Sequence, residues 1–278
     1  MYAQKQILET ARRGRIRRSV EIRKKLALQK RLEQSIYGKI LSRIRKFGQS
    51  QSFLYRNFGF YEPDVTATRL TDELYPVLSE HYALCFRNVF QINNEEYELA
   101  RKQEMFEVFG RQVDIERLVA EYFATRQLFL TNISLRIARQ IDKIIRQGRL
   151  DDLTLAEISR RITERVTAIS PSRAALIART ETHSAISRAN HLYYGQAQQS
   201  FDIKMMKQWV ATNDERTRPE HRAANGQTKE MSEPFELSTP KVGIVKMQHV
   251  GDPAGGAFHS VNCRCVIIYA DERDVVIP

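Results

Sequence analysis

The chain has 278 residues, of which 42% are hydrophobic, so it can bury a sizeable core and is not a disordered tail. Its three cysteines are too few for a disulfide framework, which excludes a small disulfide-rich scaffold and favours a reducing compartment. The net charge of +11 is concentrated in residues 1–47, which hold 15 basic and three acidic residues, and the rest is close to neutral. The chain begins without an apolar signal core, and no apolar stretch approaches the ~18 residues of a membrane span. We therefore expect neither a secretory signal peptide nor a membrane-spanning helix.

The basic segment is predicted to form a long amphipathic helix. Ile36, Ile40 and Ile44 follow one another at four-residue steps, and Ile16 and Val20 extend the same stripe upstream. The charges can belong to a solvated helix face, but the scarcity of acids between Arg12 and Lys46 equally favours contact with a polyanion, either nucleic acid or an acidic protein surface. The candidate contact residues are Arg12, Arg13, Arg15, Arg17, Arg18, Arg23, Lys24, Lys25, Lys30 and Arg31.

A helical body follows an aromatic, glycine-bearing connection at residues 49–63. Helical periodicity resumes near residue 66 and persists to about residue 195. One helix is marked by isoleucines at four-residue steps from 133 to 145, and we expect Gly148 to close it in the left-handed conformation. The next helix is predicted to open at Thr154, because Glu157 completes a capping box, and Ser170-Pro171 is expected to break and restart the chain.

The composition changes beyond residue 200, where prolines and glycines separate short β-prone runs at residues 204–210, 242–247 and 265–269. The predicted fold is therefore mainly α with a C-terminal α+β domain. We expect a basic helical arm at 1–48, a helical body at 49–170, and a C-terminal domain at 171–278 that begins with a helix at 171–197 and continues as a small, loop-rich mixed α/β unit.

The C-terminal part carries an ordered set of motifs: a single tryptophan, an Asp-x-Arg-x-Arg-x-x-His run, a glycine, and a closing Asn-Cys-Arg-Cys. Together with Ala178-Arg179-Thr180-Glu181 upstream, this order over residues 172–270 resembles the phage Mu F-like minor head proteins, a family of head morphogenesis factors of tailed phages. Family members often have His-Pro-Asn-Cys-Arg-Cys, whereas this chain lacks the proline and has its histidine one residue further away. The motif positions are Trp209, Asp214, Arg216, Arg218, His221, Gly226, Asn262, Cys263, Arg264 and Cys265.

The resemblance implies a non-enzymatic minor head protein, present in few copies at the portal vertex inside the capsid, and in the host cytoplasm during assembly. Its implied partners are the portal protein, packaged double-stranded DNA, and the major capsid or scaffolding protein. It would aid head assembly and genome packaging or ejection. The alternative is a DNA-processing, metal-dependent nuclease or a phage-borne toxin that uses the same domain.

Cys263 and Cys265 also suggest a metal site, because residues two apart in an extended segment point to the same face and can converge on one ion. Completing a tetrahedron takes two more ligands, for which His221 and His259 are the best candidates, with His249 and Asp252 in reserve. Soft ligands favour a closed, structural Zn²⁺ site. The alternative is that both thiols simply pack, while Arg264 supports the fold through hydrogen bonds.

The remaining motif residues favour structural roles. The single tryptophan, Trp209, lies in a β-prone run and is interpreted as a core anchor. Asp214, Arg216 and Arg218 are interpreted as a loop clamp in which the carboxylate accepts backbone or guanidinium hydrogen bonds. ADP-ribosyl transfer through Arg179 and Glu181 is disfavoured, because residues two apart on a helix point to different faces; packing and a surface ion pair are the simpler interpretation.

Overall fold

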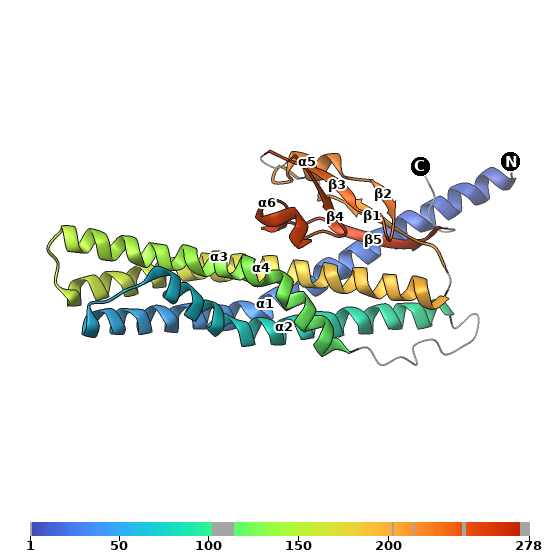
Figure 1. The fold of residues 1–278 in the computed structure, drawn as a ribbon. Coiled ribbons are helices and arrows are strands. Elements are labelled where there is room, and N and C mark those ends of the chain that lie inside the picture. Colours follow the sequence, from blue (N-terminus) through green and yellow to red (C-terminus); the bar gives the residue numbers. More distant parts are fainter. Residues whose placement is uncertain (1, 102–113, 202, 213, 241–242, 273–278) are drawn as a thin grey trace. The chain divides into compact units, whose positions relative to one another are not determined.

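The structure is a computed structural model that describes residues 2–101, 114–201, 203–212, 214–240 and 243–272, and the side chains of these except 2–19, 96–101 and 201. Figure 1 shows the elements in chain order. Among the described residues, no helix is both long and apolar enough to cross a membrane. The elements are α1 (Tyr2–Phe58), α2 (Pro63–Arg101), α3 (Ile115–Leu150), α4 (Leu155–Phe201), β1 (Met205–Val210), α5 (Pro219–Ala223), β2 (Thr228–Glu230), β3 (Phe235–Thr239), β4 (Gly243–Met247), a 3₁₀ turn at Pro253–Gly255, α6 (Gly256–Ser260) and β5 (Val266–Asp271).

These elements form two compact units that are discontinuous in sequence. The helical unit comprises Glu33–Leu84 and Asp114–Glu181, and the sheet-containing unit comprises Met1–Leu32, Cys85–Val113 and Thr182–Pro278. Helices α1, α2 and α4 each contribute residues to both units. The predicted fold class, mainly α with a C-terminal α+β unit, is confirmed.

In the helical unit, the apolar stripe of α1 is the core side of the helix. Ile36, Ile40 and Ile44 are at most 1% exposed, and they share the interior with apolar residues of α2, α3 and α4. The same helix continues through the predicted connection to Phe58, since Tyr55 is fully buried and Ser52 donates a hydrogen bond to the Ser159 carbonyl. The expectation of a connection over residues 49–63 is therefore wrong for residues 49–58, because tertiary packing keeps them helical, and the connection is limited to residues 59–62.

The end of α3 differs from the prediction at Gly148. Asp152, not Gly148, takes the left-handed conformation, with φ of 53°. Its N–H and that of Leu153 bond back to the carbonyls of Arg149 and Gly148, at 3.3 and 2.9 Å, which is the Schellman pattern of a helix C-terminus. Gly148 is required for another reason: a Cβ at that position would lie 2.5 Å from Ile158, so only glycine allows α4 to approach this closely.

The start of α4 confirms the predicted capping box. The Thr154 amide donates to Glu157 Oε2 at 2.8 Å, and the Glu157 amide donates to Thr154 Oγ1 at 3.3 Å. The expected break at Ser170-Pro171 is wrong, because α4 runs continuously through Pro171. Pro171 has no N–H to donate to the Thr167 carbonyl. Thr167 is an exposed residue, while Val166, Ser170 and Ala174 stay buried on the core side.

The sheet-containing unit has a three-stranded antiparallel sheet in the order β2-β1-β5 and a separate β3–β4 hairpin. The three β-prone runs correspond to β1, β4 and β5, and the pattern missed the short strands β2 and β3. Trp209 on β1 is fully buried and meets the Phe235 ring edge-on, with 5.4 Å between the ring centres, a position that fits the predicted core anchor. Buried Lys207 donates to the carbonyls of Met231 and Gln248, which ties β1 to the hairpin loops.

Candidate metal centre

Three short elements of the sheet-containing unit bring the motif residues together. His221 lies on α5, His259 on α6, and Cys263 and Cys265 lie in the turn that leads into β5. Asn262 opens this turn in the left-handed conformation, with φ of 55°, which asparagine tolerates better than most residues.

A clamp of charged residues holds the turn in place. Arg264 forms a bidentate ion pair with Asp214, with Nη2 2.7 Å from Oδ1. The same carboxylate accepts from the Arg216 amide at 3.1 Å, and Arg218 donates to the Val261 carbonyl at 2.6 Å. Hydrogen bonding from Arg264 lowers the pKa of Asp214 to about 2, so the carboxylate is charged at neutral pH. The geometry is that of the predicted loop clamp.

The two thiols converge on one nitrogen of His221. Its Nδ1 lies 3.3 Å from Cys265 Sγ and 3.6 Å from Cys263 Sγ, and the three ligand atoms all lie within 4.8 Å of one another. Each of the three residues is at most 2% exposed. This cluster of one imidazole and two thiols places three ligand atoms within reach of one metal ion.

The two thiols have opposite pKa shifts. A hydrogen bond from Cys265 lowers the pKa of the Cys263 thiol, while that bond and burial raise the pKa of Cys265. Cys263 is therefore the thiol that ionises first. Thiolates and neutral imidazole are ligands that Zn²⁺ prefers, and the residues present fit that ion.

His259 stands behind His221 instead of beside the thiols. Its Nδ1 lies 3.0 Å from His221 Nε2, the ring nitrogen that faces away from the cysteines, and its own Nε2 lies 3.0 Å from Thr239 Oγ1. Burial and the neighbouring His221 ring lower the pKa of His259 to about 4, so it is neutral at pH 7. When His221 Nδ1 binds a metal, its Nε2 carries the proton and donates to His259, which fixes the orientation of the ligand. Thr239 belongs to this arrangement and was not foreseen.

The two reserve ligands lie elsewhere. His249 Nδ1 lies 2.9 Å from the Val250 carbonyl, and its ring is 5.5 Å from the ring of His191 on α4. Asp252 accepts from the backbone amides of Gln248 and Ala254, as the N-cap of the 3₁₀ turn. Neither belongs to the cluster formed by His221 and the two cysteines.

The neutral His191 and His249 predict acid sensitivity. Burial lowers the pKa of His249 to about 4, and burial together with the His249 ring lowers that of His191 to about 2, from the usual 6.5. Because the unfolded chain takes up these protons first, the stabilisation is present above pH 6.5 and is lost as the pH falls toward 4. We expect a loss on the order of 2–3 kcal/mol from the fully buried His249 alone.

The measurement is chemical denaturation of the full chain between pH 7 and pH 4, with a chelator present so that metal release does not contribute. In His249→Asn, whose amide can still donate to Val250, the slope should be shallower. An equal slope in both proteins would contradict the assignment.

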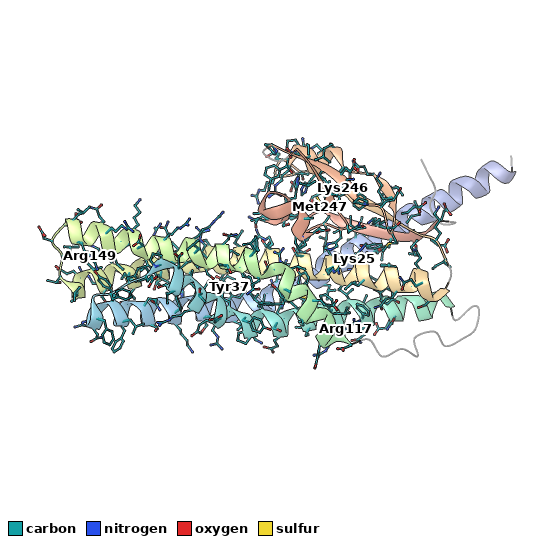
Figure 2. The ribbon with its side chains drawn as sticks, in the orientation of Figure 1. Lys25, Tyr37, Arg117, Arg149, Lys246 and Met247 are labelled. Carbon is teal, nitrogen blue, oxygen red and sulfur yellow. The ribbon has the colours of Figure 1, made fainter. Side chains whose placement is uncertain are left out.

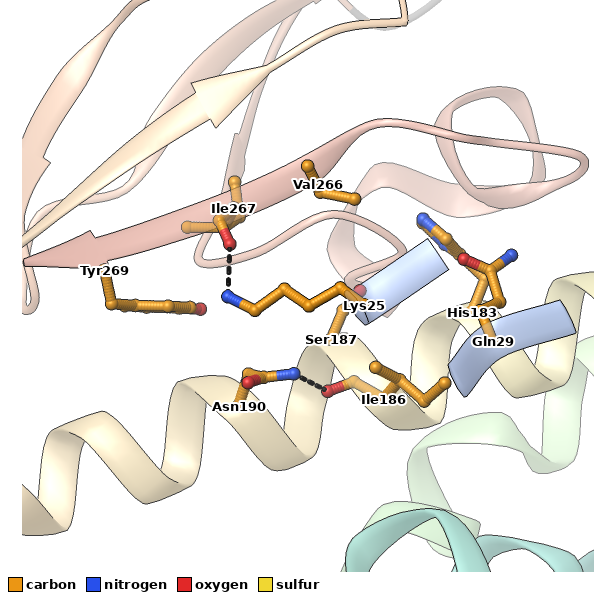
Figure 3. Close-up of a pocket in the computed structure, with 9 residues that line it drawn as sticks. All are labelled: Lys25, Gln29, His183, Ile186, Ser187, Asn190, Val266, Ile267 and Tyr269. Atoms are coloured by element: carbon orange, nitrogen blue, oxygen red, sulfur yellow. Dashed lines mark hydrogen bonds between the residues drawn. The ribbon is translucent and has the colours of Figure 1, made fainter. Parts of the chain in front are cut away.

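The candidate basic residues differ in their surroundings. Arg23, Lys24, Lys30 and Arg31 are exposed, and Arg31 donates to Asn88 at 2.8 Å. Lys25 is instead only 12% exposed: it bonds Glu21 at 2.6 Å and the Ile267 carbonyl of β5 at 3.2 Å. Figure 3 shows Lys25 extended toward β5, with its Nζ beside Tyr269 and bonded to the Ile267 carbonyl; the Nζ lies 5.5 Å from the centre of the Tyr269 ring. The side chains of Arg12, Arg13, Arg15, Arg17 and Arg18 lie outside the described residues.

The helical unit contains a buried ion pair that the sequence pattern did not predict. Glu181 is fully buried and accepts two hydrogen bonds from Arg126, at 2.7 and 3.0 Å, and one from Tyr82 at 2.6 Å. Glu181 is therefore not part of the expected surface ion pair. Arg179, two residues earlier, makes the partly exposed pair, with Glu33 at 3.3 Å.

Comparison with known proteins finds a family similarity in the second half of the chain. A family model described as Phage Mu protein F like protein matches residues 139–268. These residues, slightly less than half of the chain, are similar to the Mu F-like family. The match contains the whole metal centre and clamp, and it begins inside α3, upstream of the motifs from which the resemblance was first drawn.

Two curated relatives each match about half of this chain. The chain is 29% identical over 143 residues to the minor head protein GP7 of Bacillus phage SPP1, which covers 50% of this chain and 42% of GP7. It is 31% identical over 132 residues to the NAD(+)--arginine ADP-ribosyltransferase EFV of Enterococcus faecalis (strain ATCC 700802 / V583), which covers 48% of this chain and 26% of that enzyme. The chain thus spans less than half the length of either relative. No solved structure matches it.

Proposed function

We propose that this protein is a minor head protein of a tailed bacteriophage, located in the capsid interior near the portal and present in the host cytoplasm during assembly. The observation that carries this proposal is the Mu F-like match over residues 139–268, together with the similarity to the minor head protein of Bacillus phage SPP1. The proposed partners are the portal protein, packaged double-stranded DNA, and the major capsid or scaffolding protein.

The charge distribution supports contact with DNA. Residues 1–47 hold 15 of the 44 basic residues, and those of them with described side chains are mostly exposed. Each Lys or Arg that meets a phosphate releases condensed counterions, so such a segment binds duplex DNA without reading its sequence. The segment is not a free arm throughout, because Leu28, Leu32 and the isoleucines after them are buried.

We further propose that His221, Cys263 and Cys265 hold a structural Zn²⁺. The described residues supply three of the four ligands of a tetrahedral site, because His259, the predicted fourth, lies behind His221. The three ligands are at most 2% exposed, which leaves little room for a substrate at the fourth position. A small sheet with few strands gains most from a structural metal. This supports a non-enzymatic role over a metal-dependent nuclease, and the ADP-ribosyltransferase relative shares only a quarter of its own length with this chain.

The test is quantitative mass spectrometry of purified phage particles. We expect this chain to be present in far fewer copies than the major capsid protein and to co-purify with the portal. The same protein, incubated with plasmid and Mg²⁺ or Zn²⁺, should leave the DNA uncut. Absence from the particles would overturn the head-protein proposal, and cleavage that disappears in His221→Ala would favour the nuclease.

A further inference from the structure

Five basic side chains of the helical unit lie on two neighbouring helices: Arg136, Arg139 and Lys143 on α3, and Arg165 and Arg173 on α4. We call them the α3–α4 basic face. All except the half-buried Arg173 are exposed. None of Arg136, Arg139, Lys143 and Arg173 makes a hydrogen bond or ion pair with any residue that the structure describes.

Helical geometry places these residues on one surface. Residues 136, 139 and 143 follow the i, i+3, i+7 spacing that shares a side of a helix, and Ile137 and Ile141, on the opposite side, are fully buried. Helix α4 is adjacent, because Arg165 donates to Gln140 of α3 at 3.0 Å. Figure 1 shows α3 and α4 as consecutive long helices joined by a short loop.

The acids of these stretches do not neutralise the face. Asp142 accepts from Arg146 at 2.8 Å, and Glu164 pairs with Arg160 at 3.8 Å. The paired cations are therefore Arg146 and Arg160, whereas those of the face stay uncompensated. Cations that lie close together without counter-ions repel one another, and this repulsion destabilises the free protein. An anionic partner would remove it.

The character of the face points to phosphate instead of a protein partner. Protein interfaces are anchored by buried apolar and aromatic side chains. In the described stretch of α3 between Leu128 and Leu150 no large apolar side chain is exposed, and the same holds for α4 between Leu155 and Arg179. Four of the five basic residues are arginines, whose guanidinium groups bind phosphate oxygens in pairs.

We propose that the α3–α4 basic face binds the phosphate backbone of double-stranded DNA, in addition to the basic segment at the start of α1. This inference rests on the proposed DNA contact and names a second surface for it. Three contact residues on α3 span about 10 Å along a rigid helix, so they can meet neighbouring phosphates without ordering a flexible chain. Four of the five residues lie within the region that matches the family.

The test is binding of the full chain to a duplex of arbitrary sequence, measured over a range of salt concentrations. Neutralising Arg136, Arg139 and Lys143 to glutamine should flatten the log–log salt slope by about 2 to 3, since each lost phosphate contact removes about 0.9. The matched control is Arg117→Gln, Arg146→Gln and Arg160→Gln, which removes the same charge from exposed, ion-paired positions on the same helices. It should change the slope by less than 1.

A third variant separates this inference from the proposed function. Neutralising Arg12, Arg13, Arg15, Arg17 and Arg18 tests the α1 segment alone. If that variant loses all DNA binding while the α3 variant keeps the parent slope, the face is refuted and the proposed contact through α1 stands. Equal effects of the α3 variant and its control would also refute the face. If the unaltered protein does not bind duplex DNA, both DNA contacts fail, whereas the presence of the chain in particles is decided independently.

Discussion

Replacing Glu181 by glutamine is expected to lower the free energy of unfolding by about 3–5 kcal/mol, because it leaves a buried guanidinium without its counter-ion. Arg126 is 2% exposed, and its ion-pair partner among the described residues is Glu181, at 2.7 Å. Interaction with Glu181 keeps the pKa of Arg126 raised despite burial, so the side chain stays charged. The Tyr82 hydroxyl, which donates to the same carboxylate, would then face an uncharged amide. Urea or guanidinium denaturation gives the change directly.

The matched control is Arg179→Gln, two residues upstream on the same helix. Its pair with Glu33 is 42% exposed on the arginine side, so we expect a cost below about 1 kcal/mol. The double replacement Arg126→Met and Glu181→Leu should recover much of the loss, since it removes both charges together. A small cost for Glu181→Gln, equal to that of the control, would show that the pair is not desolvated in solution.

Removing the metal is the second large effect. Zinc that is bound a thousandfold above its dissociation constant stabilises the folded state by about 4 kcal/mol, so a chelator should lower the melting temperature of the sheet-containing unit by roughly 10 °C or more. Elemental analysis of the full chain should find about one zinc per chain, since His221, Cys263 and Cys265 form one cluster.

Two substitutions separate metal loss from general destabilisation. Cys263→Ser should abolish both the zinc content and the effect of the chelator. Cys85→Ser also removes a fully buried thiol, but from α2, away from the cluster, so its zinc content should be unchanged. Retention of zinc by Cys263→Ser, or far less than one zinc per chain in the parent, would disprove the site. Replacing His259 by glutamine should weaken zinc binding about 10- to 100-fold without abolishing it, because this residue orients His221.

Features that depend on residue type and spacing within a few positions could be predicted from the sequence. The α1 stripe, the capping box at Thr154 and the tryptophan of β1 depend on spacing and residue type within a few positions, and all three are found in the structure. The pairing of Cys263 with Cys265 follows equally from the two-residue repeat of extended backbone. The ordered motifs predicted a resemblance to the Mu F-like family, and the family model matches residues 139–268.

Tertiary structure decided the features that depend on distant segments. Pro171 and the stretch after residue 48 were expected to interrupt helices, but packing of buried side chains on both sides of each point keeps the helices continuous. The role of His259 depends on which ring nitrogen of His221 faces the cysteines, and the ion pair of Glu181 depends on an arginine 55 residues away. Sequence spacing specifies which side of an element a residue occupies, whereas only the packed fold determines what it meets there.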